Sequence, residues 1–381
     1  MRDAADLPPA HRLRVVLVEG FWGGSHRAAA EGWKAASQHH VSILHLPARF
    51  WKWRMRGAAF AFARRLRERS GEVDLLFATN VVDLAHLRAF LPRPVPTVLY
   101  FHENQAAYPS LTGEEVPERD LGYAFTDLAS ALAADRVAFN SAFQRDAFFD
   151  SMGALVRRMP DVRPLWALEE VQAKTSVLPL GVTLEDVPRR AETDRGPPLV
   201  LWNHRWECDK DPETFFRVLE RLAARGVSFR VAVAGEAFRR QPSVFAQARG
   251  ALAGRVAHWG FVSDRGEYVR LLARADVTVS TARQENFGLS LVEAAFAGAH
   301  PLAPRRLSYP EVLPPGLHDV CLYEGEADLE ARLEALLTGR APRLSPDALR
   351  AALGVHGWRE RAPTWDLFLA QVPAAGKVWY K

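Results

Sequence analysis

The stretch Glu285-Asn-Phe-Gly-Leu-Ser-Leu-Val-Glu293 places two carboxylates eight positions apart, one just before a predicted helix and one inside it. Gly288 lies in the turn that opens this helix, and apolar residues continue it to Phe296. A helix N-terminus has unpaired backbone N–H groups and a partial positive charge, so it suits a phosphate. The flanking carboxylates accept hydrogen bonds from hydroxyl groups of a sugar or ribose. The stretch therefore predicts a nucleotide-sugar site.

Short β-rich runs alternate with amphipathic stretches along the chain, which is the pattern of α/β units around parallel sheets. A first series of predicted strands comprises residues 13–18, 41–46, 73–78, 97–101 and 136–140. A second series comprises residues 199–203, 229–234, 256–259, 277–280 and 299–302. The segment 179–198 between the two series is rich in Pro, Gly and charged residues, as linkers are. We therefore expect two doubly wound domains with a cleft between them.

The 381 residues suffice for two domains of ordinary size. We place the first domain at residues 1–185 and the second at residues 186–354. Residues 355–381 include Trp358 and Trp365, and we expect a C-terminal helix there that packs back across the first domain.

The composition is that of a soluble globular protein, with 48% hydrophobic and 25% charged residues. No apolar run reaches the roughly 20 residues that span a bilayer, and the start of the chain lacks the apolar core of a signal peptide. The two cysteines, Cys208 and Cys321, provide neither a disulfide framework nor a metal cluster. These features predict a cytoplasmic protein. The formal net charge of +4 is by itself weak support for a nucleic-acid partner.

Basic and aromatic residues concentrate between Arg49 and Arg69, where eight Arg or Lys accompany one Glu. Basic groups pair with phosphates and aromatic faces stack on exposed bases, so this segment is a candidate RNA-binding surface. The alternative is an Arg-rich helix that is solvated on one face and buries Phe60 and Phe62 in the core. A second basic group consists of Arg157, Arg158 and Arg163. These residues either contact the RNA backbone or belong to a solvent-exposed surface.

Two loops of the first domain follow predicted strands, at the edge of the sheet where α/β proteins bind ligands. Gly23 and Gly24 lie after the first strand and let the backbone approach a ligand closely. Their loop matches neither the dinucleotide fingerprint nor a P-loop, and a plain tight turn is the alternative. His102, Glu103 and Asn104 follow the fourth strand. They line the expected cleft or, alternatively, cap a loop around a structural histidine.

The loop after the first strand of the second series contains Arg205 and Lys210, and each can neutralise a diphosphate. Asp209 and Asp211 form an Asp-x-Asp, which in other proteins can carry a divalent metal. Because Pro212 follows, we favour Asp211 as the N-cap of a helix over a metal ligand.

Arg205 and Lys210, followed by Glu285-x₇-Glu293, resemble the donor-site signature of retaining glycosyltransferases with the GT-B architecture of two Rossmann-like domains. Further blocks narrow the resemblance to the tRNA-queuosine α-mannosyltransferase family, over about residues 15–313. These blocks are Phe-Trp-Gly-Gly-Ser-His (21–26), Leu-Pro-Ala-Arg-Phe-Trp-Lys-Trp-Arg (46–54), Tyr-Phe-His-Glu-Asn-Gln (100–105), Phe-Asn-Ser-Ala-Phe (139–143), His-Arg-Trp-Glu-Cys-Asp-Lys-Asp-Pro-Glu (204–213) and His-Trp-Gly-Phe (258–261).

This resemblance implies transfer of mannose from GDP-mannose to a cyclopentene hydroxyl of queuosine at the tRNA wobble position, with retention of configuration. The first domain is then the acceptor (tRNA) domain and the second the donor domain, with the active site in the cleft. The implied partners are queuosine-containing tRNA and a nucleotide sugar, without a membrane. No metal or other cofactor is implied. No covalent nucleophile stands out, which fits a same-face mechanism in which the leaving phosphate takes the acceptor's proton.

The resemblance also assigns roles to individual residues. The residues implied in catalysis are Arg205, Lys210, Glu285 and His102. Those implied in donor binding are Gly23, Gly24, Arg205, Lys210, Glu285, Asn286, Phe287, Gly288 and Glu293. Those implied in tRNA binding are Trp51, Lys52, Trp53, Arg54, Arg56, Glu103 and Asn104. Arg205 and Lys210 are expected to hold the diphosphate, Glu285 the sugar and Glu293 the ribose, with His102 beside the transferred sugar.

Three other functions are compatible with the same residues. One is a glycosyltransferase that acts on a lipid or polysaccharide precursor. Another is a non-catalytic RNA-binding protein with this fold, and the third is a nucleotide-sugar epimerase or hydrolase. The donor residues also suit another hexose, or UDP in place of GDP.

Overall fold

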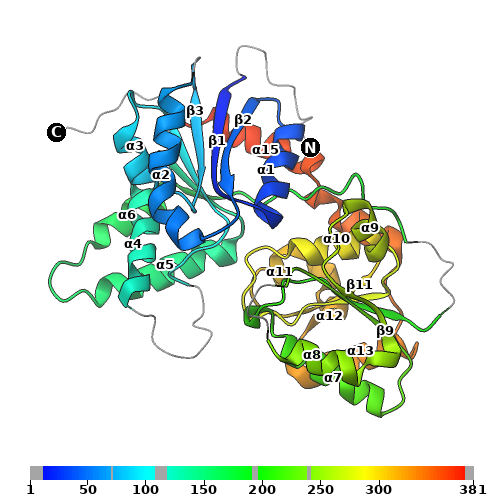
Figure 1. Cartoon of the computed structure of the whole chain (residues 1–381). Helices are drawn as coiled ribbons and strands as arrows, with labels where there is room; N and C mark the ends of the chain where they lie inside the picture. Colours follow the sequence, from blue (N-terminus) through cyan, green and yellow to red (C-terminus); the bar gives the residue numbers. More distant parts are fainter. Residues whose placement is uncertain (1–11, 70–71, 108–117, 191–195, 238–241, 374–381) are drawn as a thin grey trace. The chain divides into compact units, whose positions relative to one another are not determined.

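The computed structural model describes residues 12–69, 72–107, 118–190, 196–237 and 242–373. The chain divides into two compact units. Unit 1 consists of Met1–Gly181 and Trp358–Lys381, and unit 2 of Val182–Gly357. Each unit is built on a six-stranded sheet whose described strands all pair in parallel (Figure 1). The predicted α/β class with two domains is therefore confirmed.

The sheet of unit 1 has the order β2-β1-β3-β4-β5-β6. Its strands are β1 (Arg14–Trp22), β2 (His40–Pro47), β3 (Leu75–Thr79), β4 (Thr97–Phe101), β5 (Arg136–Phe139) and β6 (Thr175–Val177). Every residue of β3 and β4 is buried, as expected for central parallel strands that are covered on both faces.

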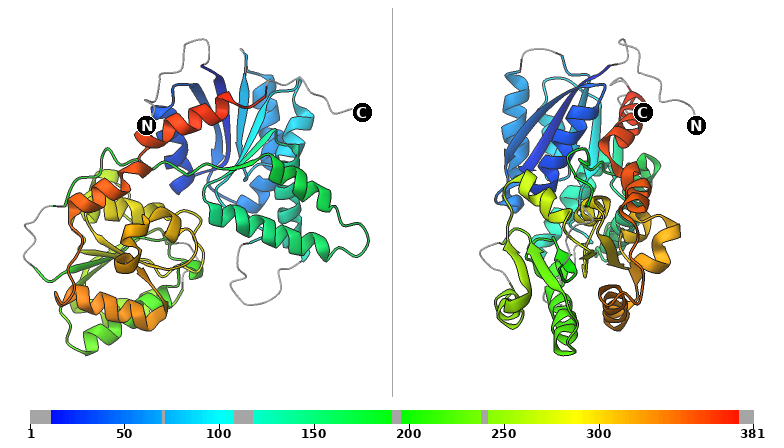
Figure 2. Two further views of the ribbon diagram at one scale, coloured as in Figure 1. Left: turned by 180° about the vertical axis from the view of Figure 1, so that it is seen from behind. Right: turned by 90° about the vertical axis from the view of Figure 1, so that its right-hand side faces the viewer.

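Helices cover both faces of this sheet (Figure 2). One face carries α1 (Gly24–Ala36) and α15 (Trp358–Ala370), which contact each other. The other carries α2 (Trp51–Arg67), α3 (Leu84–Phe90), α4 (Glu118–Ala133) and α6 (Leu165–Ala173), with α5 (Ala142–Arg157) packed on α6.

Trp365 of α15 completes the hydrophobic packing between α1 and the sheet of unit 1. Its ring centroid lies 5.3 Å from that of Trp33 in α1. It lies 5.7 Å from Phe77 in β3 and 4.9 Å from Tyr100 in β4. All of these side chains are buried, and aromatic residues contribute strongly to core packing. A helix from the C-terminal end of the chain is thus part of the core of unit 1.

The sheet of unit 2 has the order β12-β11-β10-β7-β8-β9. Its strands are β7 (Leu199–Trp202), β8 (Arg230–Ala234), β9 (Val256–Gly260), β10 (Val277–Val279), β11 (His300–Pro304) and β12 (Leu322–Tyr323). On one face α7 (Pro212–Ala224) packs with α8 (Val244–Ala251) and α13 (Gly325–Leu337). On the other, α10 (Leu289–Ala297) packs with α9 (Arg265–Leu272) and α14 (Pro346–Leu353), near the short helices α11 (Tyr309–Val312) and α12 (His318–Cys321). In the described parts of the chain, no helix has the length and apolar character that crossing a membrane requires.

The carboxylate of Asp366 fixes α15 to the end of α1. It accepts hydrogen bonds from Ser37 Oγ at 2.6 Å and from the backbone N–H of Gln38 at 2.7 Å. We expect Asp366→Ala to lower the free energy of unfolding by about 2–4 kcal/mol, because it removes a buried carboxylate and the two hydrogen bonds by which it joins α15 to the end of α1. Leu367→Ala, on the exposed side of the same helix, is the control and should change it by less than about 0.5 kcal/mol. Equal urea midpoints for the two variants would contradict this role of Asp366.

Candidate functional site

The loop after β7 brings Lys210 into the interior of unit 2. The chain forms a short 3₁₀ turn at Cys208–Lys210 and then begins α7 at Pro212. Asp211 is the N-cap of α7, and its carboxylate accepts a hydrogen bond from the N–H of Thr214 at 3.4 Å. The helix-cap interpretation of Asp211 is thus confirmed. Lys210, one position earlier, is buried.

The ammonium of Lys210 is surrounded by negatively charged and polar oxygens. Nζ lies 3.3 Å from Glu285 Oε2 and 3.4 Å from Asp209 Oδ2, and it donates to the carbonyl of Gln284 at 2.7 Å. Burial works to lower the pKa of Lys210, but Glu285 and Asp209 outweigh it and raise that pKa. Lys210 and Glu285, which were predicted to act together from separate motifs, are therefore in direct contact as an ion pair.

Glu285 lies where the sequence predicted a phosphate seat. Its Oε1 accepts from the backbone N–H groups of Asn286 at 3.2 Å, Phe287 at 3.4 Å and Gly288 at 3.1 Å. Gly288 caps α10 with a φ of 96°, a conformation that favours glycine. In this structure the carboxylate of Glu285 itself accepts the hydrogen bonds of these N–H groups. Burial acts to raise the pKa of Glu285, but Lys210, with smaller effects of His204 and of the N–H of Phe287, lowers it.

Glu293, the second glutamate of the motif, is buried in α10 and bound by two residues of α9. Arg265 Nη1 donates to Oε1 at 2.5 Å, and the hydroxyl of Tyr268 donates to Oε2 at 3.3 Å. Arg265 also forms hydrogen bonds to both carboxylate oxygens of Asp186, at 2.8 and 2.9 Å. Burial raises the pKa of Glu293, although Arg265 acts against it. The sequence did not predict Arg265 or Tyr268; the only signal was that a buried carboxylate requires a partner.

Arg205 is more exposed than the other predicted donor-site residues. Its guanidinium is 3.1 Å from Glu207, and 49% of its side chain is exposed. Its positive charge is close enough to Lys210 to act to lower the pKa of that residue. The two basic residues of this loop therefore differ in environment: Lys210 is fixed and Arg205 is solvated.

Two polar residues at the end of β7 were missed by the sequence analysis. Asn203 Nδ2 donates to the hydroxyl of Tyr268 and to the carbonyl of Ser290, both at 3.0 Å. His204 Nδ1 lies 3.3 Å from Ser290 Oγ, while its Nε2 is buried without a hydrogen-bond partner in the described residues. Burial and the nearby Lys210 lower the pKa of His204 to about 4, so the ring is neutral at pH 7. Their position at the carboxyl end of β7 was the available signal.

In unit 1, the glycines predicted for donor binding are explained by backbone geometry. A Cβ at Gly23 would lie 2.5 Å from the Cβ of Ala48. Gly24 has a φ of 50°, in the left-handed region, where it begins α1. Close packing and the turn into α1 are thus sufficient reasons for both glycines, and donor binding by them remains a prediction.

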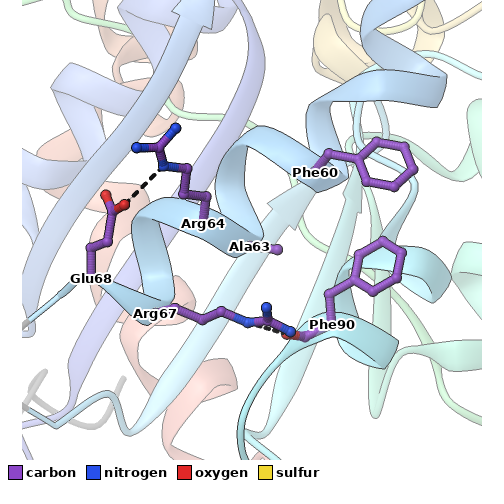
Figure 3. Close-up of a pocket in the computed structure, with 6 residues that line it drawn as sticks. All are labelled: Phe60, Ala63, Arg64, Arg67, Glu68 and Phe90. Atoms are coloured by element: carbon purple, nitrogen blue, oxygen red, sulfur yellow. Dashed lines mark hydrogen bonds and ion pairs between the residues drawn. The ribbon is translucent and has the colours of Figure 1, made fainter.

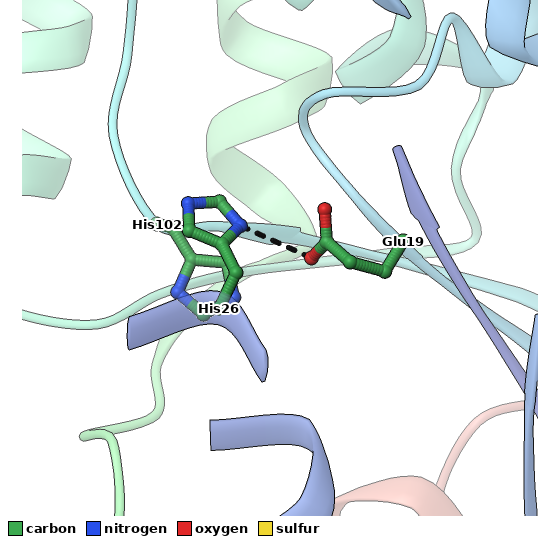
Figure 4. Close-up of side chains that lie close together, drawn as sticks. All are labelled: Glu19, His26 and His102. Carbon is green, nitrogen blue, oxygen red and sulfur yellow. Dashed lines mark hydrogen bonds and ion pairs between the residues drawn. The ribbon is translucent and has the colours of Figure 1, made fainter. Parts of the chain in front are cut away.

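His102, after β4, belongs to a cluster with Glu19 of β1 and His26 of α1 (Figure 4). The centroids of the two imidazole rings are 4.2 Å apart. His26 Nδ1 lies 3.1 Å from Glu19 Oε2. Burial, with a smaller effect of His26, lowers the pKa of His102 well below its usual range. Of these three residues, only His102 was predicted from the sequence to have a role in the site.

Glu103 and Asn104, predicted to bind tRNA, take part in local hydrogen bonds after β4. Glu103 Oε1 accepts from Gln105 Nε2 at 3.2 Å. Asn104 is buried, and its Oδ1 accepts from the N–H of Ala107 at 2.8 Å. The structure thus gives Asn104 a role in fixing its own loop.

The other predicted tRNA-binding residues lie on α2, next to Tyr123 of α4. The ring of Trp51 is 5.5 Å from that of Tyr123. Lys52 Nζ is 5.7 Å from the Tyr123 ring centroid, and Arg56 Cζ is 5.5 Å from it. Trp53, in contrast, is 79% exposed. Most of this basic-aromatic group is packed against α4, and Trp53 is the aromatic ring that it presents to solvent.

Farther along α2, Phe62 is buried but Phe60 is 61% exposed, so the alternative that placed both in the core is wrong for Phe60. Its ring stacks on Phe90 of α3 with 5.2 Å between centroids. The hollow beside this pair has a volume of about 340 Å³ (Figure 3). The residues that line it are Phe60, Ala63, Arg64, Arg67, Glu68 and Phe90.

The fold of the chain is shared with solved glycosyltransferases. A glycosyltransferase from Rickettsia africae is 12% identical with a TM-score of 0.66, and the match covers 94% of this chain and 98% of that one. Sucrose-phosphate synthase from Thermosynechococcus elongatus is 14% identical with a TM-score of 0.64, at 94% and 98% coverage. Residues 185–351 match the family model of glycosyl transferases group 1. The class is therefore a glycosyltransferase with the GT-B architecture.

The N-terminal half narrows this class. Residues 14–182 match the model of the tRNA-queuosine alpha-mannosyltransferase N-terminal region. The tRNA-queuosine alpha-mannosyltransferase of Drosophila melanogaster is 36% identical over 312 residues, which are 79% of this chain and 81% of that protein. A GDP-mannose-dependent alpha-(1-6)-phosphatidylinositol dimannoside mannosyltransferase of Mycobacterium tuberculosis is 28% identical over 230 residues, 58% and 53% of the two chains. The chain belongs to the tRNA-queuosine alpha-mannosyltransferase family, as the sequence motifs predicted.

The ion pair of Lys210 predicts a pH-dependent stability. Lys210→Met should lower the free energy of unfolding by about 3–5 kcal/mol at pH 7, because it leaves buried carboxylates uncompensated. In the variant we expect burial to raise the pKa of Glu285 above its unfolded value. The charged carboxylate then costs stability above the unfolded pKa, and this cost disappears as the pH falls through the raised folded pKa. The difference from wild type should therefore narrow between pH 7 and pH 5.

Urea unfolding at both pH values measures this difference. Lys34→Met, which removes an exposed lysine from α1, is the control and should have little effect at either pH. A difference for Lys210→Met that is the same at pH 7 and pH 5 would contradict the assigned ion pair.

Proposed function

We propose that the protein transfers mannose from GDP-mannose to queuosine at the wobble position of tRNA, with retention of configuration. The observation that carries this proposal is the 36% identity to the Drosophila tRNA-queuosine alpha-mannosyltransferase over most of both chains. The choice of donor is supported by the mycobacterial relative, whose name specifies GDP-mannose. We propose also that the reaction needs no metal ion, so that a chelator leaves it unchanged.

In this proposal the residues of unit 2 bind the donor. Lys210 and Arg205 bind the diphosphate and stabilise the negative charge that develops as GDP leaves. The oxygens around Lys210 hold its ammonium in place before the donor arrives, which limits the reorganisation needed during the reaction. Glu285 binds hydroxyls of the mannose. Glu293, whose carboxylate is oriented by Arg265 and Tyr268, binds hydroxyls of the ribose.

The basic-aromatic face of α2 binds the anticodon loop in this proposal. Bases of a single-stranded loop can be turned outward and stacked on aromatic side chains. Trp53 is suited to stacking because its ring is exposed, and Arg54 follows it in the same turn of helix. Lys52 and Arg56, held on the ring of Tyr123, add positive charge for the phosphates.

A lipid acceptor is the second candidate, because the mycobacterial relative is named for a phosphatidylinositol mannoside. A transferase with a lipid acceptor has the same donor site, but it does not use Trp53 and Arg54 to bind its acceptor. The following assays separate the two candidates.

We expect the wild-type protein to add one hexose to queuosine when it is incubated with GDP-mannose and queuosine-containing tRNA. Mass analysis of the digested nucleosides measures the product, and tRNA that lacks queuosine is the control. Absence of any added hexose with every nucleotide-sugar tested would exclude the proposed function.

Two variants should separate donor chemistry from tRNA binding. Lys210→Ala should reduce turnover by a factor of about 100 or more with little change in tRNA affinity, because it removes charge from the transition state. Trp53→Ala combined with Arg54→Ala should mainly weaken tRNA binding, by about 10-fold or more, and should reduce its dependence on salt. Filter binding and single-turnover kinetics measure the two effects.

The control combines Leu367→Ala with Arg340→Ala, which removes one exposed apolar and one exposed basic side chain outside α2. This double variant should have a turnover and a tRNA affinity close to those of the wild type. Equal loss of tRNA affinity in Lys210→Ala and in the Trp53 and Arg54 variant would contradict this division of roles.

A further inference from the structure

The hollow between α2 and α3 is lined by aromatic rings and guanidinium groups, and none of the residues that line it has a role in the proposed function (Figure 3). Phe60 is 61% exposed, and its ring stacks on that of Phe90. The imidazole of His86 stacks on Phe90 as well, with 6.2 Å between centroids. The volume of about 340 Å³ is at the lower end of the range of ligand sites, which suits a single planar ring better than a folded segment.

Two arginines in different environments border this hollow. Arg67 is held in place, because its Nε and Nη2 donate to the carbonyl of Phe90 at 3.0 and 2.7 Å. That carbonyl is at the C-terminal end of α3, where a positive charge is favourable. Arg64 is 81% exposed and pairs with Glu68 at 2.8 Å. Exposed pairs contribute little to stability, so Arg64 can exchange Glu68 for a phosphate at small cost.

The hollow continues a stripe of α2 that begins at Trp53. Phe60, Arg64 and Arg67 follow Trp53 by 7, 11 and 14 positions, which places them within about 40° of one line along the helix. Gly57 lies between the two exposed rings of the stripe, and a Cβ at this glycine would meet nothing within 4 Å. The surface between Trp53 and Phe60 is therefore open over roughly 10 Å, the rise of seven helical residues.

The direction of α2 relates this stripe to the edge of the sheet that the carboxyl ends of the strands form. Both β2 and β3 pair in parallel with β1, so α2, which connects them, runs back from that edge toward the amino ends. Trp53, in the first turn of α2, is near the carboxyl ends, where α/β proteins bind ligands. Phe60 and Arg64 lie farther from them. A ligand that contacts the whole stripe is thus extended, with one end near this edge.

The charge of α2 indicates that this ligand is a polyanion. The helix has six basic residues and no acidic residue. Flat rings joined by phosphates match a stripe that combines exposed aromatic rings with cations. Stacked bases of one strand are about 3.4 Å apart, so the distance from Trp53 to Phe60 corresponds to about three nucleotides. A single strand of RNA has these properties, whereas a lipid surface has no flat rings to stack on Phe60.

We infer that the stripe from Trp53 to Arg67 binds a single strand of RNA, in which one base stacks on Phe60 and neighbouring phosphates pair with Arg64 and Arg67. This inference rests on the proposed function and adds a second stacking position to its RNA surface, about three nucleotides from the base at Trp53. Because the second position is remote from the carboxyl ends of the strands, it contributes to the affinity for tRNA and not to the rate of transfer.

Filter binding with the full-length protein tests the inference. The probes are queuosine-containing tRNA and an RNA hairpin with the same anticodon loop but without queuosine. Phe60→Ala should weaken the binding of both RNAs about 5- to 100-fold, the usual effect of losing one stacked base. Phe60→Trp should bind both RNAs as tightly as the wild type, because it keeps an aromatic face at this position.

Two charge variants should act in opposite directions. Arg64→Gln should reduce the slope of log affinity against log salt concentration by about 0.7, the value for one phosphate of a single strand. Glu68→Gln should strengthen RNA binding about twofold, because it removes a carboxylate that competes with the phosphate for Arg64. Weaker RNA binding in Glu68→Gln would contradict the assignment of a phosphate to Arg64.

Gly57→Gln separates RNA binding from stability. Glutamine favours a helix more than glycine does and meets no neighbour here, so the urea midpoint should rise. The new side chain covers the stripe, so RNA binding should weaken about 10-fold or more. Gly250→Gln in α8 is the matched control, since a Cβ at Gly250 also meets nothing within 4 Å. This variant should bind RNA as the wild type does, and so should Leu367→Ala, the control for Phe60→Ala.

Wild-type RNA affinity in both Phe60→Ala and Gly57→Gln would overturn the inference. Loss of binding to phosphatidylglycerol vesicles in Phe60→Ala, with RNA binding intact, would also overturn it, in favour of a membrane surface. With GDP-mannose as donor, Phe60→Ala should raise the KM for tRNA and leave kcat within about twofold of the wild type. If the wild type binds RNA through the stripe but transfers no hexose to queuosine, the proposed function fails and the RNA site stands.

Discussion

A buried ammonium group determines how unit 2 is organised. Lys210 cannot be buried without partners, because the desolvation of an unpaired charge costs several kcal/mol. Two of its partners, Gln284 and Glu285, come from the loop before α10, which follows β10, and β10 is the direct neighbour of β7 in the sheet. Other bonds join the same two loops. The carbonyls of Lys210 and Asp211, both 2.9 Å from Thr281 Oγ1, share its one hydroxyl hydrogen, and the N–H of Arg283 donates to the carbonyl of Asp209 at 2.8 Å. The parallel sheet thus brings distant sequence motifs together at one edge.

Unit 1 uses the same geometry with different chemistry. β1 and β4 are separated by β3 in the sheet. Glu19 in β1, His26 in α1 and His102 after β4 form a cluster. A buried acid in unit 2 compensates a cation, whereas in unit 1 Glu19 is paired with His26. A fixed cation suits a diphosphate.

The sequence predicted those features that local pattern determines. Ten strands were placed close to their observed positions because each combines an apolar β-rich run with clear ends. β6 and β12 were missed because they have three and two residues, too few to form a pattern. Glu285 and Lys210 were predicted because their motifs are distinctive. Arg265 and Tyr268 were not, because the partner of a buried carboxylate such as Glu293 is chosen by tertiary packing.

The two family matches divide the chain almost where the structure does. The general glycosyltransferase region begins at residue 185 and the family-specific region ends at residue 182, while the boundary of the units falls after Gly181. A donor site built on a common fold can serve many acceptors, so specificity has to come from the other unit. In the proposed function this unit also carries the RNA surface on α2, where Trp53 is exposed.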